Sequence, residues 1–121
     1  MKRLTAKEEE IMNLLWKHGS MFIRELLAFY EEPKPHYNTV ATMIKLLEEK
    51  GFVQRRACGN THQYAAAISE KEYKSSALNE VISQYYNNSY ASVVSQFIEE
   101  EAMDLEELKE LIHQIENNKK R

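Results

Sequence analysis

Polar side chains recur on one face of a predicted helix that begins at Asn38 or Thr39 and ends at Lys50. With a rotation of about 100° per residue, these side chains lie opposite an apolar stripe on the same helix. Asparagine can read adenine, threonine can meet a phosphate or a thymine methyl group, and lysine can reach guanine or a phosphate. The pattern therefore predicts contact with double-stranded DNA. The helical residues that we expect to face DNA are Asn38, Thr39, Ala41, Thr42 and Lys45.

A predicted β-hairpin follows this helix and carries two adjacent arginines. Residues 52–57 have the pattern of a strand, residues 58–60 that of a turn, and residues 61–66 that of a returning strand. Guanidinium groups suit phosphates, and each neutralised phosphate adds roughly 0.9 to the salt dependence of binding. The hairpin residues that we expect to contact DNA are Arg55, Arg56, Asn60 and His62.

Other residue types that could do chemistry form no recognisable site. The single cysteine, Cys58, cannot form an internal disulfide and excludes zinc sites built from cysteine pairs. The four histidines lack a metal-ligand spacing such as H-E-x-x-H, and no nucleophile, base or phosphate-binding loop stands out. We therefore expect no enzyme, no metal, no cofactor and no small-molecule substrate.

Helical signals also precede the polar face. Thr5 and Glu8 form a capping box that opens a first helix, which Gly19 ends. A second, short helix with an apolar stripe begins at Ile23, and the two prolines of residues 31–35 break it. Three helices followed by a hairpin is the order of a winged helix-turn-helix module, in which the third helix enters the major groove.

Helices dominate the second half as well. Capping and apolar patterns predict a long helix opened by Ser69, a break at 87–89, a short helix over 93–98 and a last helix from Asp104. A small winged-helix core cannot bury all of these apolar stripes, so a second copy of the chain is expected to cover them. The expected dimer contacts are Leu78, Val81, Ile82, Tyr85, Val93, Val94, Phe97, Ile98, Leu105, Leu108 and Ile112.

The two halves differ in charge. Residues 1–67 contain ten basic residues (lysine and arginine) and eight acidic ones. Residues 68–121 contain six basic and eleven acidic residues. This asymmetry indicates that residues 1–67 bind an anion and that residues 68–121 have another function. We predict a mainly α fold with a small β-hairpin wing, in which a winged-helix DNA-binding domain (1–67) precedes C-terminal dimerisation helices (68–121).

The composition is that of an ordinary soluble globular protein. Hydrophobic residues make up 43% and charged residues 29%, which excludes the class of disordered tail proteins. The chain contains no run of about 18 apolar residues, and its first ten residues lack the apolar core of a signal peptide. We expect a cytoplasmic protein.

Three segments resemble the BlaI/MecI-type penicillinase repressors. Leu4–Met12, followed by Trp16, is similar to the opening pattern of that family, LT-x-x-E-x-x-IM-x-x-x-W. Asn38–Thr42 is similar to its recognition helix and Ser92–Glu99 to its dimer segment. Each motif is short, but their order and spacing cover nearly the whole chain.

The resemblance implies a homodimeric winged-helix repressor that occupies a palindromic operator of a beta-lactam-resistance or envelope-stress type operon. It also implies a membrane sensor-protease that releases the repressor by cutting its C-terminal region, between Gln96 and Phe97. Ala41 and Leu46 stand where many members carry arginine, so the resemblance does not fix the operator sequence.

The residues alone leave a second class of function open. Polar residues on an outward helical face are also typical of a solvated surface, and winged helices also serve as protein-interaction modules that bind no DNA. A mobility shift with the DNA upstream of the gene distinguishes these alternatives.

Overall fold

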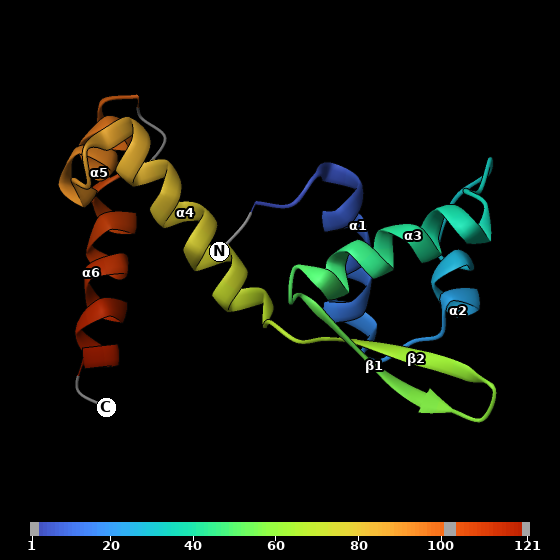
Figure 1. Cartoon of the computed structure of the whole chain (residues 1–121). Coiled ribbons are helices and arrows are strands. Elements are labelled where there is room, and N and C mark those ends of the chain that lie inside the picture. The colour runs from blue at the N-terminus through green and yellow to red at the C-terminus, as the bar shows by residue number, and fades with distance from the viewer. Residues whose placement is uncertain (1–2, 101–103, 120–121) are drawn as a thin grey trace. The chain divides into compact units, whose positions relative to one another are not determined.

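The computed structural model describes residues 3–100 and 104–119, which form helices and one hairpin. In chain order the elements are α1 (Ala6–His18), α2 (Ile23–Leu27), α3 (Tyr37–Glu49), β1 (Val53–Cys58), β2 (Thr61–Ala66), α4 (Glu70–Tyr86), α5 (Tyr90–Glu99) and α6 (Leu105–Lys119) (Figure 1). This order confirms the predicted fold class. The chain divides into two compact units, Met1–Ala77 and Leu78–Arg121. No helix in the described ranges is both long enough and apolar enough to cross a membrane.

Helix α1 begins with the predicted capping box. The Thr5 hydroxyl accepts a hydrogen bond from the Glu8 backbone N–H at 3.2 Å, and the Glu8 carboxylate accepts one from the Thr5 N–H at 2.9 Å. Gly19 ends the helix with a φ of 84°, a conformation that disfavours residues with a Cβ. The box satisfies two of the N–H groups that a helix start leaves without partners.

The core of the first unit is built from one face of each of its helices. Helical spacing brings these apolar side chains to a common centre, and burial of each one stabilises the fold by about 1.5–3 kcal/mol. Its most completely buried members are Ile11, Met12, Leu26, Val40, Ile44, Leu47 and Phe52.

The hairpin is antiparallel, with pairs that run from Val53 opposite Ala66 to Cys58 opposite Thr61. The first strand begins one residue later than predicted because Phe52 turns into the core, where it is 1% exposed. Met21, in the connection between α1 and α2, forms a bridge with Tyr64 through two backbone hydrogen bonds of 2.8 Å. This bridge ties the hairpin to the start of α2.

The first turns of α4 belong to the first unit. Tyr73 is buried against the rings of Trp16 and Phe52, and its hydroxyl accepts a hydrogen bond from the Leu4 N–H. The Trp16 indole N–H donates to the Ile68 carbonyl at 2.8 Å. The compact unit therefore extends beyond residue 67, to Ala77. The assignment of roles to residues 1–67 and 68–121 stays a prediction.

A largely buried ion pair joins two helices of this unit. Lys50, which follows α3, donates to both carboxylate oxygens of Glu8 at 2.8 and 3.0 Å. Burial disfavours the charged form of Glu8, but the hydrogen bonds from Lys50 and Thr5 outweigh it and lower the pKa of the carboxyl. The pair fixes the end of α3 against the start of α1.

The second unit contains the end of α4 and the helices α5 and α6. Asn87 and Asn88 adopt positive φ angles of 49° and 62°, which end α4 at the predicted break. The Ser89 hydroxyl caps α5 by accepting from the Ser92 N–H, and the Asp104 carboxylate caps α6 by accepting from the Glu107 N–H. Helix α5 is strongly apolar, yet none of its side chains is fully buried within this chain.

Candidate nucleic-acid interface

Helix α3 presents the predicted polar face to solvent. Asn38, Thr39, Thr42 and Lys45 are exposed and Ala41 is half-buried, whereas the opposite face, with Val40, Ile44 and Leu47, is fully buried. The buried stripe holds the helix on the core, so its outer face is free for another molecule. Leu46 is also on this outer side and is 44% exposed.

Helix α3 begins earlier than the sequence predicted. His36, rather than Asn38 or Thr39, is the N-cap, because its extended backbone lets its carbonyl accept from the N–H groups of Thr39 and Val40. Asn38 and Thr39 therefore lie inside the first turn, and their side chains are not used for capping. They are available to a partner of this helix.

The Thr42 hydroxyl already has one partner. It donates to the Asn38 carbonyl at 2.9 Å, a bond typical of threonine within helices. Because the proton is used, the oxygen can only accept from a further partner while this bond persists. Thr42 thus presents an acceptor and a methyl group rather than a donor.

The two arginines of the hairpin point to opposite faces of β1, as alternating strand residues must. The Arg55 Nε lies 3.4 Å from the Glu48 carboxylate of α3, and an Arg56 guanidinium nitrogen donates to the side-chain carbonyl of Gln63 at 2.8 Å. The structure places Arg55 beside α3 and Arg56 on the other face of the hairpin. Contact of both arginines with phosphates stays a prediction.

The tip of the hairpin carries the remaining predicted contacts. Asn60 is exposed in the turn, where Gly59 has a φ of 61°. His62 is half-buried, and its ring centre lies 6.5 Å from that of Tyr64. Burial and the Glu48 carboxylate raise the pKa of Tyr64, while Arg55 acts in the opposite direction, so this phenol is neutral at pH 7. Cys58 is a free, half-buried thiol.

Two further side chains beside this surface were not predicted from the sequence. Arg24 of α2 and Tyr37 of α3 line a small hollow of about 210 Å³ together with Thr61 of β2. Arg24 is exposed and Tyr37 is 51% exposed. Each residue lies in the first turn of its helix. A basic and an aromatic side chain at these two positions are the signals from which they could have been predicted.

The predicted dimer contacts form a mostly open apolar surface in the second unit. Ile82 is 3% exposed and is therefore covered by its own chain. The exposed members are Leu78, Tyr85, Phe97, Ile98, Leu105 and Ile112. The half-buried members are Val81, Val93, Val94 and Leu108. A chain that leaves this much apolar surface open is expected to cover it with a partner.

The predicted cleavage bond, between Gln96 and Phe97, lies inside α5. The Gln96 side chain accepts from the Tyr86 hydroxyl at 2.7 Å and donates to the Glu100 carboxylate at 3.1 Å. A protease must bind an extended chain, so these contacts have to open before the bond can be cut. Across residues 3–100 and 104–119, no three histidine, cysteine or acidic side chains gather into a group that could hold a metal ion.

Comparisons with known proteins identify relatives of the whole chain. Residues 4–117 match the family described as Penicillinase repressor. The penicillinase repressor of Bacillus licheniformis is 27% identical over 98% of this chain and 94% of its own. The methicillin resistance regulatory protein MecI of Staphylococcus aureus (strain N315) is 29% identical over 89% of each chain.

Solved structures share the fold at low identity. The complex structure of hsRosR matches with a TM-score of 0.54 and 17% identity, over 84% of this chain and 91% of that chain. The crystal structure of M. tuberculosis Rv0081 matches with a TM-score of 0.50 and 18% identity, over 69% of this chain and 81% of that chain.

Proposed function

Because the chain belongs to the penicillinase repressor family, we propose that it acts as a homodimer that binds a palindromic operator through α3 and the hairpin. As a member of this family, the chain is a transcriptional repressor. The observation that carries the proposal is the polar outer face of α3, held by a fully buried stripe on its other side.

The geometry of α3 suits a major groove. The groove is about 12 Å wide and accepts one helix whose leading residues are short and polar. Asn38 and Thr42 can meet base edges, and Lys45 can reach guanine or a phosphate one turn later. Arg55 lies beside α3, so it would contact the phosphates nearest to the helix, whereas Arg56 and Asn60 would meet those under the hairpin.

A dimer gives this interface its specificity. Two copies joined through the apolar surface of their second units would place two α3 helices on two half-sites, in separate major grooves. Binding of the first half-site then raises the effective concentration of the second helix at its own half-site. The exposed Phe97, Ile98 and Leu105 would be covered in such a pair.

Cleavage between Gln96 and Phe97 would release the repressor from its operator. The cut would place a new ammonium and a new carboxylate among apolar groups that the dimer keeps dry, which is costly. It would also separate the remainder of α5 and α6 from the DNA-binding unit. The dimer would weaken, and the operator of a beta-lactam-resistance or envelope-stress type operon would be vacated.

Binding of the full-length chain to labelled DNA from upstream of its gene tests the proposal. Lys45→Ala should weaken binding to this DNA more than binding to a scrambled duplex, and loss of a base contact costs about 1–3 kcal/mol. Lys74→Ala, which removes an exposed lysine of α4, is the matched control and should bind as wild type does. Equal affinity of the wild-type chain for both duplexes would contradict an operator-binding repressor, and binding to neither duplex would favour a protein-interaction module.

A further inference from the structure

A pocket of about 660 Å³ lies within the first unit, between α1, the segment that joins α2 to α3, and the first turns of α3. Its volume falls within the range of about 300–1,000 Å³ that is usual for small-molecule sites. Apolar side chains from all three segments form much of its wall: Leu14, Phe29, Pro33, Pro35 and Met43. The DNA-binding role uses none of these apolar groups.

A buried hydroxyl in the wall of this pocket has no partner. Within the described ranges, the hydroxyl of Tyr30 is shielded from solvent and makes no hydrogen bond. Buried polar groups nearly always have a partner, so a hydroxyl that finds none in the protein is expected to pair with a water molecule or a ligand. Burial, and then the nearby Glu10 carboxylate, raise the pKa of this phenol, which keeps it protonated at neutral pH.

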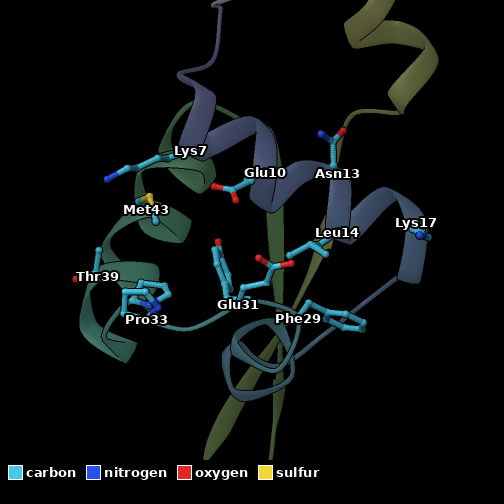
Figure 2. A pocket seen from close by; sticks show the side chains of 12 residues that line it. Lys7, Glu10, Asn13, Leu14, Lys17, Phe29, Glu31, Pro33, Thr39 and Met43 are labelled. Atoms are coloured by element: carbon cyan, nitrogen blue, oxygen red, sulfur yellow. The ribbon is translucent and has the colours of Figure 1, made fainter.

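Two carboxylates turn toward the same space. Figure 2 shows Glu10 and Glu31 pointing to the middle of the pocket, whereas Lys7 and Asn13 point away from it. In the part of the chain that the structure describes, neither carboxylate has an ion-pair partner within 4 Å. The lining also includes Lys7 and Lys17, so the two exposed carboxylates make the middle of the pocket negative but not its whole rim.

We propose that this pocket binds a small organic cation with an apolar body. The ammonium group would lie between Glu10 and Glu31 and donate to their oxygens. The Tyr30 hydroxyl is shielded from solvent, so a small movement of the side chains around it would let its oxygen accept a further hydrogen bond from the ammonium. The apolar body would lie against Leu14 and Met43. An anion of the same shape would meet two carboxylates, and a neutral analogue would leave them without a counter-charge.

The position of the pocket also couples it to α3. Thr39 and Met43 line the pocket, and Thr39 belongs to the face that we propose to meet DNA. A ligand that binds the free and the DNA-bound arrangement of α3 with different affinity must change operator affinity by the same factor. This coupling rests on the proposed function, whereas binding of the cation does not.

Calorimetry on the full-length chain, without DNA, tests binding. The probes are 2-phenylethylamine, which is protonated at pH 7, its neutral analogue 2-phenylethanol and the anion 3-phenylpropionate. We expect the amine to bind at least about tenfold more tightly than the alcohol, the anion to give no signal, and Glu10→Gln to weaken the amine about tenfold. Tyr30→Phe should weaken it severalfold, while Glu9→Gln, on the same helix but outside the pocket wall, should leave it unchanged. Equal binding of the three probes, or equal binding by the Glu10→Gln and Glu9→Gln variants, would overturn the proposal.

A second titration separates the coupling from the proposed function. The affinity for upstream DNA is measured with and without saturating amine, at matched ionic strength because salt alone weakens DNA binding. A change of at least about threefold in the wild type that is absent in Glu10→Gln supports the coupling. Unchanged DNA affinity with bound amine overturns the coupling alone. Failure to bind DNA without amine overturns the proposed function, while the calorimetric result still decides the cation site.

Discussion

Replacement of Lys50 by methionine should destabilise the chain far more than a surface change of the same kind. The variant keeps most of the hydrocarbon of Lys50 but leaves the Glu8 carboxylate, with 5% of its side chain exposed, without its counter-charge. Removal of one partner from a fully buried pair costs about 3–5 kcal/mol. Lys50 is 26% exposed and Glu8 keeps its bond from the Thr5 N–H, so we expect a loss of about 1–3 kcal/mol.

The pH dependence gives the same experiment a second readout. In the wild type the pKa of Glu8 lies below its ordinary value of 4.5, so the contribution of the pair is present above pH 4.5 and is lost as pH falls through the lowered pKa. In the variant, burial is no longer opposed by Lys50 and the pKa of Glu8 should rise. The stability difference between the two proteins should therefore shrink as the pH falls from 7 toward 4.

Urea unfolding at equal chain concentration measures both effects. Lys74→Met removes one partner of an exposed ion pair with Glu70, whose N–O distance is 3.0 Å, and is the matched control. We expect it to cost only about 0.3–0.5 kcal/mol at pH 7. Equal losses of stability in the Lys50 and Lys74 variants, or a Lys50 loss that does not vary with pH, would refute this role of the ion pair.

Three other perturbations probe separate parts of the chain. Truncation after Ala77 should leave a folded first unit. Truncation after Ala67 also removes Tyr73 and the carbonyl partner of Trp16, so thermal unfolding should show that the first unit is less stable by about 3–5 kcal/mol. Phe97→Asp should shift the sedimentation coefficient from that of a dimer to that of a monomer, because it puts a charge on the proposed dry interface. If the variant still sediments as a dimer, the interface lies elsewhere. Arg56→Ala should reduce the salt slope of DNA binding by about one for each phosphate that is no longer neutralised, without changing sequence preference. An unchanged slope would show that Arg56 does not contact a phosphate.

Local signals in the sequence were enough to predict much of the fold. The capping box at Thr5 and the turn at Gly59 depend on neighbours within a few residues, and both are present as expected. The polar face of α3 also followed from helical spacing alone. The opposite directions of Arg55 and Arg56 follow from strand alternation, so they too could have been predicted from the sequence.

Long-range contacts could not be predicted in this way. Tyr73 and Ile82 both belong to α4, yet Tyr73 packs in the core of the first unit and Ile82 lies in the second. Glu8 was predicted only as a capping residue, because its ion pair joins residues 42 positions apart. The pocket around Tyr30 likewise depends on the path of the segment after α2, which spacing does not specify.

Hydroxyl-radical footprinting of the full-length chain on DNA from upstream of its gene tests whether a symmetric dimer occupies an operator. A two-fold dimer with one α3 helix in each of two major grooves predicts two protected half-sites related by symmetry. Their centres should be separated by about 10 base pairs, or a multiple of this repeat. A single protected half-site, or uniform weak protection along the duplex, would contradict binding by such a dimer.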